Sequence, residues 1–408
     1  MKEFFKVEPI EGVLAHVPSF SEVDTEMVAL AECLGRVTAE DVYADVDIPD
    51  FNRSTMDGFA VKASSTFGAS EANPAYLNVR GQIRMGGRPD FSIGPGEAAR
   101  IATGGMLPEG ADSVIMVEHT DALDDTTIEA YRSVAPGQHV IEKGEDIRHT
   151  QPALKAGTRI RPQEAGLLGA CGCTEITVFR RPRVGIISTG DEVVPVDRVP
   201  GEGQIRDINT QTLSGLVLAA GGIPMVFGIV KDNRDDLMDK CRRALESTDM
   251  VMISGGSSVG ARDFTVEVLD ALPDTAILVH GISISPGKPT ILARSGGKPF
   301  WGLPGHAVSA MVVFAVVVRP FLDRLCGLSE TARLFPVQAV LNRNLASAQG
   351  RVDFVRVRLF EEHDVVRAEP ILGKSGLINT MVKANGLIAI GMNTEGLEKD
   401  AIVKVIPL

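Results

Sequence analysis

The 408-residue sequence has few aromatic residues, few cysteines, a deficit of basic residues and no long apolar run. Aromatic residues make up 5% of the chain and hydrophobic residues 44%, which is typical of an α/β protein with an aliphatic core. Five scattered cysteines exclude a disulfide framework and favour a reducing, cytoplasmic location. The longest apolar run, residues 307–318, is far shorter than the roughly 20 residues of a membrane-spanning helix. The charged segment MKEFFKVEPIEG is not a signal peptide.

The net charge limits the classes of partner that the chain is expected to bind. A formal net charge of −12 argues against nonspecific binding to nucleic acid or to an anionic membrane surface. It leaves a small anionic ligand open, because a local cluster of N–H groups, basic residues or a bound cation overrides the global sign. Cys171 and Cys173 form the only close cysteine pair, and they lack the second pair or histidine that a zinc site needs.

The order of residue patterns predicts several domains. Apolar spacing over residues 8–40 predicts two helical pieces broken near Pro18, with Gly35 as a C-cap. Short β-like runs between Gly and Pro clusters fill 47–146, and a helix is expected at 163–169. We therefore expect a framework and dimerisation domain, 1–46 and 147–180, interrupted by a small β-rich inserted domain, 47–146.

Residues 181–328 alternate between strand and helix patterns. The expected strands are 184–188, 224–230, 250–254, 276–280 and 290–293, and the expected helices are 209–220, 235–246, 263–271 and 306–325. This alternation predicts a doubly wound, mostly parallel sheet, in which ligands bind beyond the carboxyl ends of the strands. Residues 329–408 are again β-rich, with runs at 352–359, 388–390 and 401–406, and predict a C-terminal β-barrel.

Three junctions in the α/β segment predict an anion site. A glycine-rich loop follows the strand at 250–254, and glycines there would let backbone N–H groups approach a phosphate. A second junction lies at 188–192, and a third, a rigid turn carrying Lys288, lies at 285–289. The candidate binding residues are Ser188, Thr189, Gly190, Asp191, Ser254, Gly255, Gly256, Ser257, Lys288, Pro304 and His306.

Three carboxylates near the expected strand ends suggest a metal. Glu192, Asp232 and Asp263 together would suit Mg²⁺ beside a phosphoanhydride. Each aspartate is equally well explained as a helix N-cap, Lys288 as a surface lysine, and His306 as a solvated first-turn residue. Two polar loops outside this segment, 52–60 and 102–110, have no evident role in a core.

The order and spacing of these motifs resemble the MoeA / gephyrin E-domain family of molybdopterin molybdenumtransferases over essentially the whole chain. The matching segments are STMDGFA at 54–60, 103–110 with 114–118, 144–147, 188–192, 207–211, 254–260 with Asp263, 286–289, and 303–305 with 309–310. The resemblance implies an elongated, cytosolic homodimer that inserts molybdate into adenylylated molybdopterin with divalent metal and release of AMP. It implies a site shared between the parallel-sheet domain of one subunit and the β-rich domain of the other.

Motif positions carry the family's functional residues onto Asp57, Thr103, Asp146, Glu192, Asp232, Asp263 and Ser375. The family also implies transient contacts with the molybdopterin adenylyltransferase and with molybdoenzyme maturation factors. Two departures stand out: Ser285 replaces a lysine common in the family, and His306-Ala307 replaces Asn-Pro. These changes leave tungstate open as the metal oxyanion. There are two alternative functions: a molybdopterin-binding scaffold without turnover, and adenylyl transfer to molybdopterin. The acidic residues favour the inserting enzyme.

Overall fold

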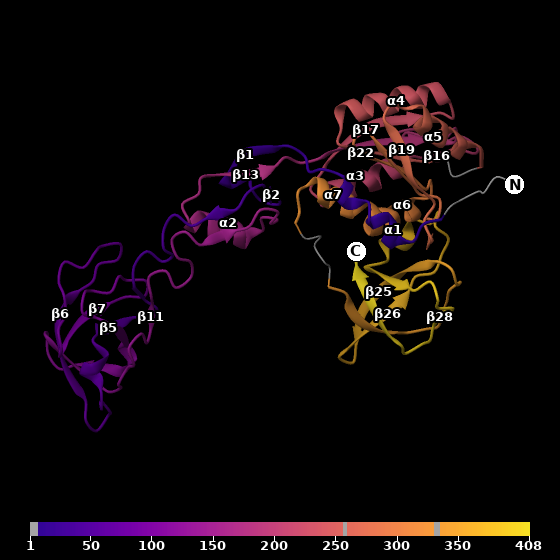
Figure 1. Cartoon of the computed structure of the whole chain (residues 1–408). Helices are drawn as coiled ribbons and strands as arrows, with labels where there is room; N and C mark the ends of the chain where they lie inside the picture. The colour runs from indigo at the N-terminus through magenta and orange to yellow at the C-terminus, as the bar shows by residue number, and fades with distance from the viewer. Residues whose placement is uncertain (1–6, 256–258, 330–334) are drawn as a thin grey trace. The chain divides into compact units, whose positions relative to one another are not determined.

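The chain forms two compact units, which are described separately (Figure 1). The computed structural model describes residues 7–255, 259–329 and 335–408, and for 259–263 it describes the backbone alone. Unit 1 comprises Met1–Glu40, Ala156–Ile160 and Ile176–Leu408. Unit 2 comprises Asp41–Lys155 and Arg161–Glu175.

A six-stranded sheet forms the centre of unit 1. Its order is β17 (Ile223–Val230), β14 (Arg183–Thr189), β18 (Met250–Ser254), β22 (Lys298–Leu303), β21 (Ile291–Ser295) and β19 (Thr275–His280). The first four strands are parallel, and the last two are antiparallel to their neighbours. The expected mostly parallel sheet is therefore confirmed. Strand β22 has no counterpart among the expected strands, and the others agree with expectation to within one or two residues at most ends.

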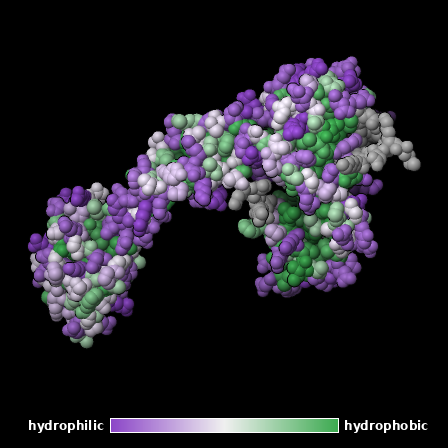
Figure 2. Space-filling view, in the orientation of Figure 1, coloured by the Kyte–Doolittle hydropathy of each residue, from purple (hydrophilic) through white to green (hydrophobic). Residues whose placement is uncertain are grey.

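Helices cover both faces of this sheet. The helices are α3 (Asn209–Ala219), α4 (Arg234–Ser247), α5 (Val259–Ala271), α6 (Ala307–Val313) and α7 (Arg319–Leu325), the last two joined by a π-helical turn over Phe314–Val318. One apolar core includes α3, α6 and α7 residues around Trp301, and a second includes α4 residues around Phe300. The visible side of α4 is hydrophilic in Figure 2, as expected for a covering helix with one buried side.

A closed β-barrel follows the sheet in unit 1. Its strands are β23 (Val337–Leu341), β25 (Val352–Glu362), β26 (Val365–Pro370), β27 (Gly386–Ile390) and β29 (Ile402–Pro407). They pair in the order β25-β26-β23-β29-β27, and β27 returns to β25, which closes the barrel. Smaller elements are the β24 (Leu345–Ala346) and β28 (Gly396–Leu397) pair and helix α8 (Asn379–Val382). The short strand β20 (Ile284–Ser285) pairs with β25, so the turn that begins at Ser285 starts from the barrel sheet.

The helical prediction for 8–40 is largely wrong. Helix α1 (Ile10–Leu14) is followed by the 3₁₀ turn Val17–Ser19, strand β1 (Thr25–Ala29), the 3₁₀ turn Leu30–Glu32 and strand β2 (Val37–Thr38). Strands β1 and β2 flank β13 (Glu175–Phe179) in a three-stranded sheet. Met27 is 67% exposed and Leu34 56% exposed, so the apolar spacing did not mark a buried helical face. Gly35 has a positive φ of 76°, but it follows a turn and caps no α-helix.

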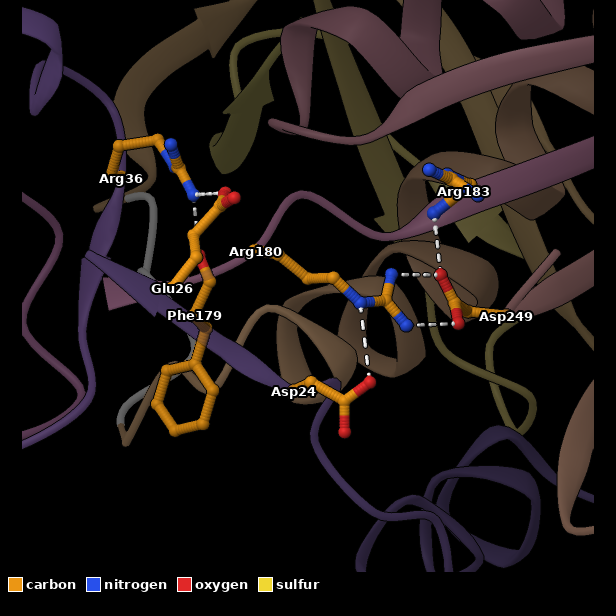
Figure 3. A network of polar contacts seen from close by, with 7 residues as sticks. All are labelled: Asp24, Glu26, Arg36, Phe179, Arg180, Arg183 and Asp249. Carbon is orange, nitrogen blue, oxygen red and sulfur yellow. Dashed lines mark hydrogen bonds and ion pairs between the residues drawn. The ribbon is translucent and has the colours of Figure 1, made fainter. Parts of the chain in front are cut away.

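Charged side chains connect β1 and β13 to the sheet (Figure 3). Both terminal nitrogens of Arg180 lie 2.7 Å from the carboxylate of Asp249, which also accepts from the Arg183 N–H at 2.7 Å. The same guanidinium pairs with Asp24 through Nε at 3.6 Å. Burial acts to raise the pKa of Asp249, but the bonds from Arg180 and Arg183 outweigh it and lower that pKa.

Unit 2 contains a six-stranded β-sheet. Its order is β8 (Ser113–Met116), β5 (Gly58–Val61), β7 (Glu97–Ile101), β6 (Ala75–Gln82), β10 (Thr127–Ala130) and β9 (Thr120–Ala122). Two-stranded pairs are β4 (Arg53–Ser54) with β11 (Val140–Ile141), and β3 (Val42–Tyr43) with β12 (Pro152–Leu154). The expected β-rich texture of 47–146 is confirmed, and α2 (Pro162–Ala170) lies where a helix is expected. Five 3₁₀ and π turns, at Val17–Ser19, Leu30–Glu32, Ala63–Thr66, Val117–His119 and Phe314–Val318, complete the described helical elements.

Candidate functional site

A cavity of about 360 Å³ lies at the carboxyl edge of the parallel strands of unit 1. This volume is within the range of small-molecule sites. Predicted site residues that line it are Ser188, Thr189, Gly190, Glu192, Asp232, Ser254, Gly255 and His306. The other lining residues are Val193, Ile205, Arg206, Asp207, Ile208, Asn209, Gly305, Ala307 and Gly376. The structure thus brings together residues that are far apart in sequence, as the parallel sheet predicts.

The pairing of β14 with β18 sets the positions of the backbone atoms at the floor of the cavity. Ser188 pairs with Ser254 across β14 and β18, and both are buried. Gly255 follows with a φ of 129°, and a Cβ there would lie 2.2 Å from the carbonyl oxygen of Thr189. Glycine is therefore required by the close approach of two strand ends. The Gly190 N–H donates to the Val230 carbonyl at 3.1 Å, and the Gly255 N–H reaches the Leu303 carbonyl at 3.4 Å.

Buried hydroxyls form a chain beside the cavity. Asp207 accepts from the Thr210 N–H at 3.1 Å and from its hydroxyl at 2.6 Å. The Thr210 oxygen lies 3.1 Å from Ser188 Oγ, which lies 3.4 Å from Ser254 Oγ. All four side chains are buried. The first turn of α3 thereby joins the ends of β14 and β18 in one polar network.

The start of helix α6 meets the segment between β26 and α8 beside the cavity. His306 Nδ1 lies 2.8 Å from Ser375 Oγ, and the Val308 N–H donates to the Ser375 carbonyl at 3.2 Å. Asn209 Nδ2 donates to the Gly305 carbonyl at 2.8 Å, which fixes the turn before α6. Two predicted residues from distant segments, His306 and Ser375, are therefore in contact.

Glu192 and Asp232 line one side of the cavity, and Asp191 is in contact with Asp232 but does not line it. The Asp232 N–H donates to Asp191 Oδ1 at 3.2 Å, while Lys231 Nζ donates to the Asp191 carbonyl at 2.6 Å. Partial desolvation and the charges of Asp191 and Glu192 raise the pKa of Asp232, and Lys231 opposes this shift. Partial burial and two neighbouring carboxylates therefore both disfavour the charged form of Asp232.

Several predicted residues lie elsewhere or are not described. Lys288 and Pro304 are not among the residues that line this cavity. Gly256 and Ser257 lie outside the described residues, and Asp263 is described only by its backbone in α5. Within 7–255, 264–329 and 335–408, no group of three or more His, Cys, Asp or Glu side chains is arranged to hold a metal ion. The metal set that includes Asp263 stays a prediction.

In unit 2, two predicted residues meet across 46 positions of sequence. Asp57 Oδ1 accepts from the Thr103 N–H at 2.7 Å and from its hydroxyl at 3.0 Å. These two bonds, the N–H bond foremost, lower the pKa of Asp57, so this exposed carboxylate is ionised at neutral pH. The loops are held by further backbone bonds, from Ser54 N–H to Gly105 O and from Gly104 N–H to Ser54 O.

Asp146 lies on a neighbouring loop of unit 2. Its N–H donates to the Ile48 carbonyl at 3.0 Å, and its charge acts on the buried Cys171 thiol. The pKa of Cys171 is raised mainly by burial. The charges of Cys173, Asp45 and Asp146 raise it further. The contacts of Asp146 involve its backbone and this thiol, and among the described residues none connects it with Asp57 or Thr103.

Three cavity-associated residues escaped prediction: Asp207, Asn209 and Thr210. The signal was present, because 207–211 is one of the segments that match the family motif. Their spacing also fits a carboxylate placed just before a helix, where it accepts from first-turn N–H groups. A single aspartate before a helix is most simply explained as a cap, and its connection to Ser188 through Thr210 depends on tertiary structure.

Comparisons with known proteins agree along the chain. Residues 7–172 match the family described as "MoeA N-terminal region (domain I and II)", 185–324 the "Probable molybdopterin binding domain", and 338–408 the "MoeA C-terminal region (domain IV)". The molybdopterin molybdenumtransferase of Bacillus subtilis is 32% identical over 403 residues, which cover 98% of this chain and 93% of the relative. The chain belongs to the MoeA family.

Other MoeA relatives extend the comparison. A Methanocaldococcus jannaschii protein named for molybdopterin biosynthesis is 38% identical over 93% of this chain and 91% of its own length. A crystal structure of a MoeA molybdopterin biosynthesis protein from Pyrococcus horikoshii OT3 has a TM-score of 0.85 at 30% identity, covering 99% of this chain and 100% of that one. Among the described residues of this MoeA-family chain, the helices are too short or too polar to span a bilayer.

Proposed function

We propose that this protein is a molybdopterin molybdenumtransferase, which inserts molybdate into adenylylated molybdopterin and releases AMP. The observation that carries the proposal is the cavity at the carboxyl edge of the parallel sheet, where predicted residues from four separate segments converge. Relatives of this name match nearly the full length of the chain, which supports the assignment. Transfer of the metal oxyanion belongs to the last stage of molybdenum cofactor assembly.

The residues present fit a divalent cation at the acidic side of the cavity. Glu192 and Asp232 both line it, and the pKa of Asp232 is raised by partial burial first and by the neighbouring carboxylates second. Carboxylate oxygens are the protein ligands that Mg²⁺ prefers. These two side chains would hold the ion, with Asp263 as the predicted third, and the bound ion would supply positive charge beside the phosphoanhydride.

Asp57 and Thr103 are proposed to act in the same reaction. Their contact holds an ionised carboxylate in one orientation at the surface of unit 2. An orientation fixed before the substrate binds costs no reorganisation during the reaction. Asp57 would therefore position or stabilise a reacting group as an anion and would not donate a proton near neutral pH. Asp146 is proposed as a further residue of this side of the reaction.

His306 is proposed to replace part of the basic charge that this chain lacks at Ser285. It lines the cavity and contacts Ser375, so it is placed where an anionic ligand would pass. Because this region departs from the common family pattern, tungstate is retained as an alternative oxyanion. If the His306→Gln variant binds molybdopterin and molybdate like wild type from about pH 5.5 to 8, the histidine has no such role.

A single assay tests the proposed function. The purified full chain is incubated with adenylylated molybdopterin and Mg²⁺, with molybdate, with tungstate, or with neither. AMP release that depends on an oxyanion supports insertion and reports which oxyanion is preferred. Tight substrate binding without AMP release identifies a scaffold instead, and AMP release independent of oxyanion identifies a simple hydrolase.

The family resemblance also motivates the oligomeric and cellular proposals. We propose a cytoplasmic homodimer, with the domains bounded as the sequence predicts, and transient contacts with the adenylyltransferase and with molybdoenzyme maturation factors. Light scattering of the purified protein measures the mass directly. A mixture of Asp57→Asn and Asp232→Asn chains should recover activity if catalytic groups are contributed by different subunits, whereas a mixture of inactive chains would stay inactive otherwise.

A further inference from the structure

The Ser54 hydroxyl lies three residues before Asp57 and is bonded twice to the backbone between them. Ser54 Oγ accepts the Met56 N–H at 3.1 Å and donates to the Met56 carbonyl at 2.5 Å. Ser54 is 2% exposed, so water does not compete for these bonds. Serine side chains that bond to nearby backbone in this way hold a turn in one conformation. Because the Met56 carbonyl belongs to the peptide bond that leads into Asp57, the hydroxyl fixes the direction from which the chain enters that residue.

The backbone of Ser54 holds the loop that supplies the donors to Asp57. Ser54 pairs with Val140 across β4 and β11, which anchors it from one side. On its other side, the Ser54 N–H donates to the Gly105 carbonyl at 3.0 Å, and the Ser54 carbonyl accepts the Gly104 N–H at 2.8 Å. Gly104 directly follows Thr103 in the sequence. Ser54 is therefore a fixed point shared by the aspartate and by the residue that orients it.

The chain after Asp57 is fixed by close backbone contacts. Gly58 begins β5, and a Cβ at this position would lie 1.9 Å from the Ile115 carbonyl oxygen, so only glycine fits between β5 and β8. The Asp57 carbonyl accepts the Val117 N–H at 3.0 Å. The remaining freedom lies before Asp57, at Met56, which is where the Ser54 hydroxyl acts.

We propose that Ser54 is a positioning residue, whose hydroxyl holds Met56 so that the Asp57 carboxylate meets both donors of Thr103. Those donors reach the same atom, Asp57 Oδ1, at 2.7 and 3.0 Å, and this convergence tolerates little rotation of the side chain. Among the described residues, Oδ2 takes part in no hydrogen bond, which leaves it for a group of the substrate. The inference rests on the proposed function, in which Asp57 acts in AMP release.

Substitutions of the Ser54 side chain test this role while both partners of the contact remain. Ser54→Ala removes the two bonds to Met56 and keeps Asp57 and Thr103. We expect kcat for AMP release to fall about tenfold while KM for adenylylated molybdopterin stays within about twofold, because a misplaced reacting group loses transition-state stabilisation more than binding. Ser54→Thr keeps the hydroxyl and should restore kcat to within about threefold of wild type.

The titration of the Asp57 carboxyl gives a readout that needs no turnover. In the wild type, the Thr103 bonds lower the pKa of Asp57. If Ser54→Ala releases the contact, that pKa should rise toward the ordinary value of an aspartate, and Ser54→Thr should keep it low. Carbon-13 NMR follows the carboxyl resonance, which is assigned by its absence in Asp57→Asn. The charged or titratable side chains on neighbouring elements are unchanged in these variants, and none contributes to the lowered pKa: Arg53, Arg84, Arg100, Glu118, His119 and His139.

A buried hydroxyl elsewhere in unit 2 provides the matched control. Thr66 is 0% exposed, and its Oγ1 donates to the Ala63 carbonyl at 2.8 Å and accepts the Val134 N–H at 3.0 Å. Thr66→Val removes the same two kinds of bond, with partners outside the Asp57 and Thr103 loops. It should lower the melting temperature but leave kcat and the titration of Asp57 unchanged. A general loss of stability in unit 2 is thereby separated from a local effect at Asp57.

Thermal melts show whether each variant is folded. Ser54→Cys, whose thiol is a weak donor and acceptor, replaces Ser54→Ala if the alanine variant unfolds. The proposal is overturned if the pKa of Asp57 stays low in the folded Ser54→Ala or Ser54→Cys chain, if it rises equally in Thr66→Val, or if it rises while kcat stays at the wild-type value.

The two readouts separate this inference from the proposed function. Oxyanion-dependent AMP release by the wild type, with an Asp57 titration that Ser54→Ala does not change, leaves the proposed function standing and rejects the role of Ser54. A pKa that rises in Ser54→Ala and not in Thr66→Val, in a protein whose wild type releases no AMP, supports the hold of Ser54 on Asp57 and contradicts the proposed function.

Discussion

The cavity of unit 1 and the Asp57–Thr103 contact of unit 2 shift the pKa of an aspartate in opposite directions. Around the cavity, strand ends and buried hydroxyls make a wall, and partial desolvation with neighbouring carboxylates raises the pKa of Asp232. At the loop of unit 2 the carboxylate is exposed, and hydrogen bonds from Thr103 lower the pKa of Asp57. The opposite shifts distinguish a partly desolvated carboxyl at the cavity from an exposed carboxylate that is held in one orientation.

The largest effect on activity is expected from a substitution of Asp57, which tests whether unit 2 takes part in the reaction. Asp57→Asn keeps the shape of the side chain but removes the charge that Thr103 orients. We expect AMP release to fall about 100-fold or more, the cost of losing a preorganised electrostatic group. Steady-state assays measure it. Thr103→Ser, which retains both donors, should stay within about threefold of wild type, and an active Asp57→Asn enzyme would remove unit 2 from the reaction.

The ion pair shown in Figure 3 should affect stability without affecting either region. Arg180→Met removes both bonds to Asp249 and leaves a partly buried carboxylate short of partners. We expect a loss of about 2 kcal/mol in the first urea transition at neutral pH. The exposed Arg234, with pairs at 3.6 and 3.8 Å, is the control, and Arg234→Met should cost about 0.5 kcal/mol or less.

The pH dependence of that stability has a definite sign. The pKa of Asp249 is lowered in the folded protein, so its contribution is present above the unfolded pKa. It is lost as pH falls through the folded value. The difference between wild type and Arg180→Met should therefore shrink on acidification, and a difference that grows in acid would contradict the assigned cause.

A smaller effect is expected at Asp232. Because its pKa is raised, protons compete with a divalent cation at a higher pH than at an ordinary carboxyl. Binding of Mn²⁺, followed by electron paramagnetic resonance, should weaken as pH falls through that raised value. Asp232→Asn should lower affinity about tenfold near neutral pH and flatten the pH profile. An unchanged profile would place the ion elsewhere.

Sequence reasoning predicted the cavity because parallel strands end at one edge. Ser188 and Ser254 end adjacent strands, so the alternation of strand and helix sufficed to bring them together. The choice of Asp57 and Thr103 as functional residues came from the family resemblance, but their contact was not predicted, since loop-to-loop contacts across 46 residues leave no periodic signal. The helix expected near Met27 failed because spacing of apolar residues does not report burial, and the residue is largely exposed.

The polarity of the cavity was beyond sequence reasoning. Glycines at strand ends suggested free N–H groups, but neighbouring strands already use those of Gly190 and Gly255. The hydroxyl contacts from Ser254 through Ser188 and Thr210 end at Asp207 Oδ2, which accepts from the Thr210 hydroxyl. That atom is found only when α3 is seen to pack beside β14.

The most direct test of a division between binding and reaction is equilibrium binding of adenylylated molybdopterin to Asp57→Asn and Ser188→Ala, measured beside AMP release. The account predicts that Asp57→Asn binds the substrate within about twofold of wild type but releases little AMP, while Ser188→Ala loses affinity by about tenfold. Loss of binding in Asp57→Asn in proportion to its loss of AMP release, with Ser188→Ala unaffected, would contradict it.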